Sequence, residues 1–574
     1  MIRIIRPNML PIITAEQMRK IDRLTAEEYA VPSLLLMESA ANSCFRAIAA
    51  RFPDDLPDKK IRILCGPGNN GGDGAALARV LANVGVHTDV VLFGKIESTK
   101  GDARANFEIV RSLGSFAAGS TDRPGPLSFL ECDTISAWEE IARPRRTYDC
   151  IVDALFGTGL TRPLEGLFLQ VVQHLSLITR ARDRSSGKRP LIVSIDIPSG
   201  LNADLATPIG EAVEADLTIT LTAPKPANVL PPASHLCGEL EIAHIGSPAA
   251  LIEAANPQLF LTGADDVRRW LKQTRYTAES YKNTHGHVLL IAGSRGYTGA
   301  AVLSGNAAIK SGAGLVTIAT PASAQSSVVA QVMPEVMTTA LAETDRGAVS
   351  DSAIDHVMKL SEKATVVAIG PGLSAEDERT RTFVRQIVER RTTPVVIDAD
   401  GLNCLAPWPS ELRGSSEAPI ILTPHPGEML RLIGKTDKDS LSNRVAAVRG
   451  FAREHNVILV LKGSRTLIGS PDGRVFVNST GNAGLGTAGA GDTLTGIIAG
   501  FQAQARGTLG VDADELETTI AAVYIGGLAG DIAAKQIGMR TMVASDIRDH
   551  LSSAVLSLDS EGEVPHNQFG KLYD

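Results

Sequence analysis

A glycine-rich stretch in the second half of the chain combines residue types that can bind phosphate and move a proton. Glycines recur through Asn482–Gly491, and they allow the backbone to turn tightly and bring its N–H groups close to an anion. An apolar pattern typical of a helix follows at once, and a helix N-terminus adds partial positive charge. Asp492 stands at this junction, where a carboxylate can abstract a proton or hold a hydroxyl group. The simpler interpretation is a flexible loop that ends in a helix-capping aspartate.

A second loop of similar character lies in the first half of the chain. The apolar run Ile61–Cys65 predicts a strand, Gly66–Gly74 predicts a glycine-rich loop, and Ala75–Val84 has the spacing of a helix. Two further apolar runs end in the polar turns Asp153–Pro163 and Asp196–Gly200. Because ligands bind at the carboxyl ends of parallel strands, we expect these three turns to form one pocket.

The elements that must position these residues alternate between strands and helices along the whole chain. In the first half, apolar runs predict further strands at Thr88–Phe93, Asp149–Leu155, Leu191–Ile197 and Leu217–Leu221. In the second half, the pattern restarts at His287–Gly293 and continues at Leu315–Ala319, Thr365–Ile369, Pro394–Asp398, Pro419–Leu422 and Val457–Leu461. This alternation predicts α/β architecture, with mostly parallel sheets covered by helices on both faces.

The length of 574 residues is too great for one ordinary core, so we predict two domains. A proline-rich segment, Pro224–Pro232, ends the first pattern before the second begins. We place the domains at residues 1–247 and 248–574, with the boundary inside 245–280.

Composition and charge exclude several classes of function. With 56 Lys and Arg against 64 Asp and Glu, the formal net charge is −8, and no dense basic tract indicates a nucleic-acid partner. The six cysteines are scattered without a CxxC pair, which is typical of free thiols in a reducing compartment. No uncharged apolar run approaches the roughly 20 residues that span a bilayer, and the N-terminus lacks the pattern of a secretory signal. We therefore expect a cytoplasmic enzyme without a membrane or nucleic-acid partner.

Six motifs spread along the chain carry a resemblance to a known family: Gly66–Gly74, Asp153–Gly159, Asp196–Gly200, His425–Arg431, Lys462–Thr466 and Asn482–Asp492. With these motifs, the chain resembles the bifunctional NAD(P)H-hydrate repair enzymes over most of its length. The resemblance implies an N-terminal epimerase domain with a Rossmann-like three-layer α/β/α fold and a C-terminal, ribokinase-like dehydratase domain. The implied substrates are the hydrates NADHX and NADPHX. The first domain would interconvert their R and S forms, and the second would dehydrate the S form to NADH or NADPH at the expense of ADP, with AMP and phosphate formed.

For the epimerase domain, the resemblance implies a set of residues that contact the hydrate. These are Asp196 together with Asn69, Asn70, Gly71, Gly72, Asp73, Gly157, Thr158, Gly159, Leu160, Thr161, Arg162 and Pro163. A K⁺ site is implied at Asn70, Asp153 and Ser199, whose oxygen donors suit a weakly held monovalent cation. Asp196 is the implied acid or base for loss and re-addition of water, and a ligand to a ribose or hydroxyl group is the alternative role.

For the dehydratase domain, the resemblance implies contacts with two molecules. ADP would meet Lys462, Gly463, Ser464, Arg465, Thr466, Asn482, Ala483, Gly484, Leu485, Gly486, Thr487, Ala488, Gly489, Ala490 and Gly491. The hydrate would meet Gly314, Gly372, His425, Pro426, Gly427, Glu428, Met429, Leu430, Arg431 and Asp492. Asp492 would deprotonate the hydrate hydroxyl, which accepts the terminal phosphate of ADP, and elimination of phosphate would follow. Phosphoryl transfer also implies Mg²⁺.

Two other functions fit parts of the pattern. The second half has the character of a ribokinase-like kinase of a small hydroxylated metabolite, with the first half in a regulatory role. Alternatively, the first half is a binding module without catalytic activity. Asn70, Asp153, Asp196 and Ser199 favour an active epimerase over both alternatives. We also expect a homo-oligomer.

Overall fold

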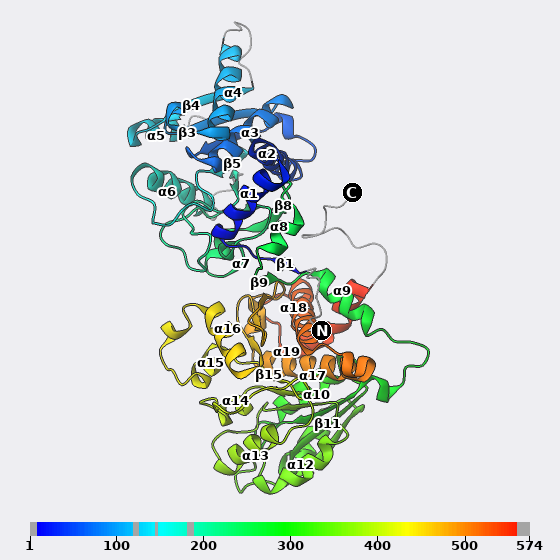
Figure 1. Cartoon of the computed structure of the whole chain (residues 1–574). Helices are drawn as coiled ribbons and strands as arrows, with labels where there is room; N and C mark the ends of the chain where they lie inside the picture. Colours follow the sequence, from blue (N-terminus) through cyan, green and yellow to red (C-terminus); the bar gives the residue numbers. More distant parts are fainter. Residues whose placement is uncertain (1–8, 119–125, 144–146, 181–188, 560–574) are drawn as a thin grey trace. The chain divides into compact units, whose positions relative to one another are not determined.

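The structure is a computed structural model, and it describes residues 9–118, 126–143, 147–180 and 189–559 (Figure 1). Its contacts divide the chain between Pro257 and Gln258 into two compact units. The N-terminal unit begins at Pro11, and the C-terminal unit begins at Gln258 and also contains Leu10. This division lies inside the interval 245–280, and the domain limits 1–247 and 248–574 stay a prediction.

The N-terminal unit is built on a parallel seven-stranded sheet in the order β4-β3-β2-β5-β6-β7-β8. The strands are β2 (Lys60–Cys65), β3 (His87–Phe93), β4 (Leu127–Cys132), β5 (Cys150–Ala154), β6 (Leu191–Ile195), β7 (Leu217–Leu221) and β8 (Glu239–Ala243). From β2 the chain adds β3 and β4 on one side, and it then adds β5 on the other side of β2. Such a reversal of strand order is where open parallel sheets bind ligands.

Helices cover both faces of this sheet, because side chains alternate between the faces along each strand. Ile63 packs beneath α2, α3 and α4, whereas its neighbour Leu64 packs on the opposite face with residues of α5 and α6. The helices are α1 (Ala15–Tyr29), α2 (Ser33–Ala49), α3 (Asn69–Asn83), α4 (Gly101–Ala118), α5 (Ile135–Ala142), α6 (Gly166–Arg180), α7 (Pro226–Val229) and α8 (Ala249–Ala254). The predicted three-layer fold of this half is therefore confirmed.

The C-terminal unit is built on an eleven-stranded sheet in the order β1-β9-β18-β17-β16-β15-β14-β13-β10-β11-β12. The strands are β1 (Leu10–Pro11), β9 (Leu259–Leu261), β10 (His287–Ile291), β11 (Leu315–Pro321), β12 (Val336–Leu341), β13 (Val366–Ile369), β14 (Val395–Ile397), β15 (Ile420–Leu422), β16 (Ile458–Leu461), β17 (Leu467–Gly469) and β18 (Val475–Val477). Strands β10 to β16 are parallel, and β17 is antiparallel to both its neighbours. The strand order reverses between β10 and β13, so this sheet also offers a ligand site.

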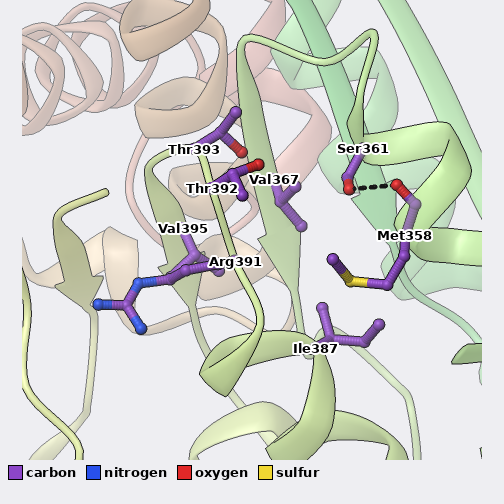
Figure 2. Close-up of a pocket in the computed structure, with 8 residues that line it drawn as sticks. All are labelled: Met358, Ser361, Val367, Ile387, Arg391, Thr392, Thr393 and Val395. Carbon is purple, nitrogen blue, oxygen red and sulfur yellow. Dashed lines mark hydrogen bonds between the residues drawn. The ribbon is translucent and has the colours of Figure 1, made fainter. Parts of the chain in front are cut away.

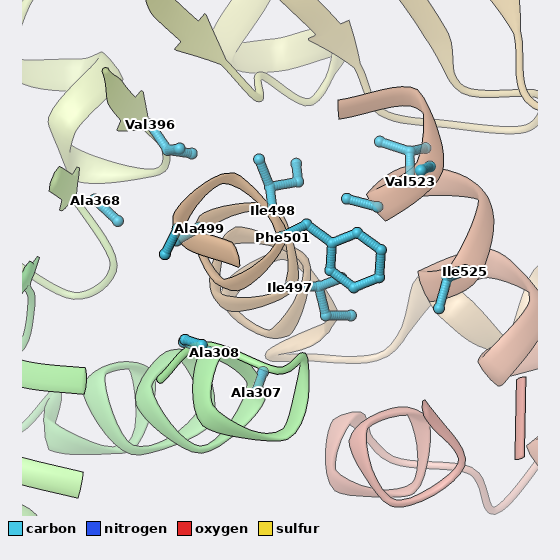
Figure 3. Packing of buried hydrophobic residues seen from close by; sticks show 14 of the residues in the cluster. Ala307, Ala308, Ala368, Val396, Ile497, Ile498, Ala499, Phe501, Val523 and Ile525 are labelled. Atoms are coloured by element: carbon cyan, nitrogen blue, oxygen red, sulfur yellow. The ribbon is translucent and has the colours of Figure 1, made fainter. Parts of the chain in front are cut away.

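The helix that follows the glycine-rich stretch is the central helix of the C-terminal core. This helix is α17 (Ala490–Leu509). Figure 3 shows Ile497, Ile498 and Phe501 surrounded by side chains of α10 (Thr298–Lys310), α18 (Glu515–Ile537) and the sheet. Gly496 allows α17 to approach α10, because a Cβ atom there would lie 2.1 Å from the Ser304 carbonyl oxygen. The N-terminus of α17 is therefore held in a fixed place.

The remaining helices of this unit surround the sheet. They are α9 (Ala264–Gln273), α10 (Thr298–Lys310), α11 (Ala322–Val329), α12 (Ile354–Ser361), α13 (Glu378–Glu389), α14 (Asp400–Cys404), α15 (Pro426–Leu432), α16 (Arg444–His455), α18 (Glu515–Ile537), α19 (Ala544–Asp549) and α20 (Leu551–Asp559). Helix α18 is long and apolar enough to cross a membrane, but 72% of its most apolar window is buried inside the fold. That burial is typical of a core helix.

A small, mainly apolar cavity lies near the amino ends of β13 and β14 (Figure 2). It is lined by Met358, Ser361, Val367, Ile387, Arg391, Thr392, Thr393 and Val395. The Ser361 hydroxyl donates to the Met358 carbonyl oxygen at 2.7 Å. Because this cavity lies at the opposite edge of the sheet from the carboxyl ends of the strands, it does not coincide with the predicted site.

Candidate active sites

The first candidate site begins at the carboxyl end of β2, where two loops approach closely. A Cβ atom on Gly66 would lie 2.0 Å from the Leu155 carbonyl oxygen, so glycine is required for the loops after β2 and β5 to meet. Helix α3 begins at Asn69, whereas the sequence predicted a loop to Gly74 and a helix from Ala75. This correction assigns Asn69–Asp73 to the start of the helix, whose free N–H groups suit a phosphate.

A fully buried carboxylate lies at the end of β5. One oxygen of Asp153, Oδ1, accepts hydrogen bonds from the Ser199 hydroxyl at 2.6 Å and from the Leu155 N–H at 3.3 Å. The other, Oδ2, accepts from the Ser194 hydroxyl at 2.9 Å and from the Ser199 N–H at 2.8 Å. Burial raises the pKa of Asp153, and these hydrogen bonds oppose that shift. Among the described residues no cation pairs with Asp153, so a bound monovalent cation would compensate its charge.

The predicted catalytic residue Asp196 follows β6 and faces the loop after β5. Its backbone has a φ of +67°, a conformation that residues other than glycine rarely adopt. A Cβ atom on Gly157 would lie 3.1 Å from Asp196 Oδ2 and 3.5 Å from Asn70 Oδ1, so these three residues lie together. The structure therefore brings together one residue from each of the three predicted turns.

Charged groups surround Asp196, and the sequence analysis missed two of them, Lys225 and Asp22. The Lys225 ammonium group donates to Asp196 Oδ1 and is almost fully buried. Burial raises the pKa of Asp22 to about 6, with Lys225 opposing the shift and Asp196 adding to it. Burial also raises the pKa of Asp73 well above its usual range, and Asp196 and Asp22 add to this shift. A lysine between two prolines and an aspartate in a helix carry no motif that would have marked them.

The second candidate site forms where α17 begins, at the carboxyl ends of β14 and β16. A Cβ atom on Gly491 would lie 3.2 Å from Lys462 Nζ and 3.8 Å from Asp398 Oδ2. Lys462 Nζ donates to Asp398 Oδ1 at 2.7 Å, and the Thr495 hydroxyl donates to Asp398 Oδ2 at 2.6 Å. Asp398 is fully buried. It links the lysine to α17, and the sequence had marked it only as the end of the predicted strand Pro394–Asp398.

This cluster of charges alters the proton affinity of its members. Burial raises the pKa of Asp492 to about 6, and the carboxylates of Asp398 and Asp400 add to the shift while Lys462 opposes it. Burial lowers the pKa of Lys462, but Asp398, Glu428 and Asp492 outweigh burial, so the net shift is upward. Asp492 therefore changes its charge at a pH near 6 while Lys462 stays positive, a combination that would suit a proton acceptor beside an anion.

The loop before α17 is fixed by an aspartate of α18. Asp531 Oδ2 accepts from the Gly481 N–H at 2.8 Å, and its Oδ1 accepts from Asn482 Nδ2 at 2.8 Å. Asn482 Oδ1 in turn accepts from the Gly484 N–H at 2.9 Å, where a short 3₁₀ turn begins. The stretch predicted as one continuous loop is thus a tethered 3₁₀ turn, and its last residues, Ala490 and Gly491, belong to α17.

His425 caps the helix that carries the other predicted hydrate contacts. Its Nδ1 accepts from the N–H groups of Gly427 at 3.0 Å and Glu428 at 3.4 Å, so a neutral ring carries its proton on Nε2. Glu428 completes the capping box by accepting from the His425 N–H at 2.8 Å. Burial lowers the pKa of His425, which favours this neutral form. Met429, by contrast, is buried in the core and offers no surface to a ligand.

The two other predicted hydrate contacts lie at opposite edges of the sheet. Gly372 follows β13 at the carboxyl edge, and its carbonyl oxygen accepts from the Ser294 hydroxyl at 2.8 Å. Gly314 precedes β11 at the amino edge, where a Cβ atom would lie 1.7 Å from the Lys282 carbonyl oxygen. Close packing explains the glycine at 314, and the structure separates this residue from the predicted site.

The turn Lys462–Thr466 between β16 and β17 presents backbone groups beside this cluster. Gly463 has a φ of +143° and Arg465 a φ of +53°, so the turn bends sharply. Arg465 donates to the Ser479 carbonyl oxygen at 2.6 Å, and Arg444 donates to that of Ser464 at 3.1 Å. These contacts fix the turn and leave its role in binding ADP as a prediction.

Comparison with known proteins assigns each half of the chain to a family. The family model described as NAD(P)H-hydrate dehydratase matches residues 288–553, and the one described as YjeF-related protein N-terminus matches residues 33–227. The bifunctional NAD(P)H-hydrate repair enzyme of Moorella thermoacetica is 39% identical over 96% of this chain and 98% of its own length. That of Thermofilum pendens is 35% identical over 96% of this chain and 98% of its own length.

A more distant full-length relative gives the same result. The bifunctional NAD(P)H-hydrate repair enzyme of Escherichia coli is 31% identical over 94% of this chain and 93% of its own length. Among solved structures, the ADP/ATP-dependent NAD(P)H-hydrate dehydratase of Bacillus subtilis is 30% identical, with a TM-score of 0.43, and the match covers 52% of this chain and 97% of that one. On the identity and coverage of the full-length relatives, this chain belongs to the family of bifunctional NAD(P)H-hydrate repair enzymes.

Proposed function

We propose that this chain repairs NADHX and NADPHX with two separate active sites. The N-terminal unit interconverts the R and S hydrates, and the C-terminal unit dehydrates the S form to NADH or NADPH. The observation that carries the proposal is the pair of carboxylates, Asp196 and Asp492, each beside the carboxyl ends of parallel strands in its own sheet. Membership of the family supplies the substrate class.

In the dehydratase site, Asp492 acts as the base. It takes the proton of the hydrate hydroxyl as the hydroxyl oxygen forms a bond to the terminal phosphorus of ADP, and AMP leaves. The carbon–oxygen bond then breaks, and the departing phosphate takes up the proton that the neighbouring ring carbon loses as the double bond is restored. Conversion of hydroxide into phosphate supplies a better leaving group, which explains why a dehydration consumes a nucleotide.

The neighbours of Asp492 bind and orient the reactants. The N–H groups at the start of α17 and in the tethered 3₁₀ turn suit the phosphates of ADP, and Lys462 adds a positive charge beside them. His425–Arg431, apart from the buried Met429, would contact the hydrate. Mg²⁺ would neutralise phosphate charge, and because the described residues hold no cluster of three metal-ligating side chains, the phosphates themselves would supply most of its ligands.

In the epimerase site, Asp196 exchanges a proton with the hydroxyl group of the hydrate. When the hydroxyl group leaves as water, Asp196 donates the additional proton. The ring nitrogen stabilises the cation that remains. Water then adds to the other face and returns a proton to Asp196. Asn70, Asp153 and Ser199 offer oxygen donors for K⁺, which would balance the buried charge of Asp153.

Stoichiometry tests the dehydratase proposal. With the purified S hydrate and ADP, we expect AMP, phosphate and NADH to appear in equal amounts, and ATP supplied at the same concentration to be less effective. NADH formation without nucleotide cleavage would overturn the proposed phosphoryl transfer. The cytoplasmic location and the homo-oligomeric state stay predictions from the sequence.

A further inference from the structure

Lys225 is a buried charge beside the epimerase site that the proposed mechanism does not yet use. It follows β7, caps the short helix α7, and lies between Pro224 and Pro226 with 1% of its surface exposed. An ammonium group buried this deeply is costly unless its donors are satisfied. A lysine needed only for packing could be replaced by an apolar side chain of similar length, so the charge itself calls for an explanation.

All three donors of the Lys225 ammonium group have acceptors. Nζ donates to Asp196 Oδ1, to the Leu221 carbonyl oxygen at 2.9 Å and to the Thr220 hydroxyl at 3.1 Å. Asn228 joins the two backbones, because its Oδ1 accepts from the Lys225 N–H at 2.8 Å and its Nδ2 donates to the Asp196 carbonyl oxygen at 3.3 Å. The ammonium group therefore has one position relative to Asp196.

This arrangement distinguishes the two oxygens of the Asp196 carboxyl group. Oδ1 is bonded to Lys225 and also accepts from the Leu221 N–H at 3.3 Å. Oδ2 has no hydrogen bond among the described residues, and it points toward Gly157, where a Cβ atom would approach it to 3.1 Å. The lysine holds one oxygen, and the other remains available on the side where Asn70 and the loop after β5 lie.

The charges around Asp196 make the lysine important. Two further carboxyl groups, Asp22 from α1 and Asp73 from α3, act on Asp196 from other elements. The thiols of Cys44 on α2 and Cys65 on β2 are also buried nearby, and burial raises the pKa of both. Among these acidic groups, Lys225 is the cation that forms an ion pair with Asp196.

We infer that Lys225 is a positioning residue for epimerisation, which tethers Asp196 Oδ1 and directs Oδ2 toward the hydrate. The inference rests on the proposed role of Asp196. As the hydroxyl leaves, the proton moves from Asp196 to the hydroxyl oxygen, the carbon–oxygen bond breaks and a carboxylate forms against Lys225. An ammonium group already in contact stabilises that developing charge without reorganisation. Re-addition of water reverses these changes on the other face of the ring.

The test compares Lys225→Met, Asp196→Asn and the double variant in the full chain. We expect Lys225→Met to lower the epimerase kcat by about 100-fold or more with little change in KM, the size expected when proton transfer is impaired. Dehydratase activity of the same chain should be unchanged, which reports the concentration of the protein, and thermal unfolding reports whether the N-terminal unit is folded. The double variant should be no slower than Asp196→Asn, because residues that act through one group are not additive.

A control variant separates positioning from stability. Arg189→Met breaks the ion pair with Asp216, which lies at the amino ends of β6 and β7, and should lower the midpoint of thermal unfolding without slowing epimerisation. If Lys225→Met does not accumulate as folded protein, Lys225→Gln replaces it, because glutamine retains an N–H donor but not the charge. Lys225→Gln should also epimerise the hydrate more slowly than the wild type.

The outcomes distinguish the role of Lys225 from the role of Asp196. Wild-type epimerisation by folded Lys225→Met, with Asp196→Asn slow, overturns the role of Lys225 alone. Losses that add in the double variant also overturn it, because Lys225 would then act independently of Asp196. Wild-type epimerisation by Asp196→Asn overturns the proposed function of Asp196, and the inference falls with it.

Discussion

Replacing Asp492 with asparagine should abolish dehydration and stabilise the C-terminal unit. The side chain is largely buried, and its carboxyl oxygens have no hydrogen bond among the described residues. Its pKa rises to about 6 from an ordinary value of 3.8 because of burial and the nearby Asp398 and Asp400. A carboxyl group that binds its proton more tightly in the folded state opposes folding once it is ionised. Asparagine has the same shape and carries no charge.

The size of this effect follows from linkage. At about 1.4 kcal/mol for each tenfold change in proton affinity, ionising Asp492 in the folded state costs about 3 kcal/mol. This cost is absent below pH 3.8, grows as the pH rises to about 6, and is constant above that value. At roughly 2 °C per kcal/mol for a unit of this size, Asp492→Asn should raise the midpoint of thermal unfolding by about 6 °C at pH 8. Near pH 4 the two proteins should unfold at nearly the same temperature.

Calorimetry of the full chain without ligands measures the shift, and it should appear only in the transition of the C-terminal unit. Asp400→Asn is the matched control. Its carboxylate accepts hydrogen bonds from the Ser374 N–H at 2.9 Å and from Asn403 Nδ2 at 3.2 Å, so this change should not stabilise the unit. Equal unfolding midpoints for Asp492→Asn and the wild type at pH 8 would refute the raised pKa of Asp492. Dehydration at the wild-type rate would refute the role of Asp492 as base.

Three other predictions follow from the same structure. Asp531→Ala removes the acceptor that holds Gly481 and Asn482, and it should raise the KM for ADP by about tenfold. The control is Asp514→Ala, which removes the N-terminal cap of the same helix and should leave the KM for ADP unchanged. Gly496→Val forces α17 away from α10 and should destabilise the C-terminal unit by about 2 kcal/mol or more, while epimerisation continues. The control is Gly450→Ala, because a Cβ atom at Gly450 meets nothing within 4 Å. Exchange of K⁺ for tetramethylammonium should slow epimerisation and leave dehydration intact; equal loss of both activities would contradict a K⁺ site confined to the N-terminal unit.

The sheets and the edges that carry the sites could be predicted because each central strand is an apolar run followed by a polar or glycine-rich turn. Buried parallel strands produce that pattern whatever their partners are. The start of α3 at Asn69 was not predicted, because Asn-Asn-Gly-Gly has low helix propensity. The close approach of the loops after β2 and β5 favours the helical start at Asn69 despite the low helix propensity of these residues. The short strands β14 and β15 were predicted, whereas β9, β17 and β18 of the same length and the longer strands β4 and β12 were missed.

The motif residues of both sites were accessible to sequence analysis, but their charged partners were not. Asp398 and Lys462 are 64 positions apart, and only the parallel arrangement of β14, β15 and β16 brings them within 2.7 Å. Lys225 stands in a proline-rich segment that resembled the approach to a linker. No spacing rule connects it to Asp196, because their contact depends on the pairing of β6 with β7. Contacts of this kind depend on topology and require the fold.

Recovery of NADH from a mixture of R and S hydrates tests the central claim most directly. The full chain, supplied with the mixture, Mg²⁺, K⁺ and excess ADP, should convert both epimers, and the absorbance of NADH should reach the value for the total hydrate. Asp196→Asn should recover only the S fraction rapidly, and Asp492→Asn should recover neither while still interconverting the epimers. Recovery of only the S fraction by the wild-type chain would contradict the epimerase site, and no recovery with ADP or ATP would contradict the dehydratase site.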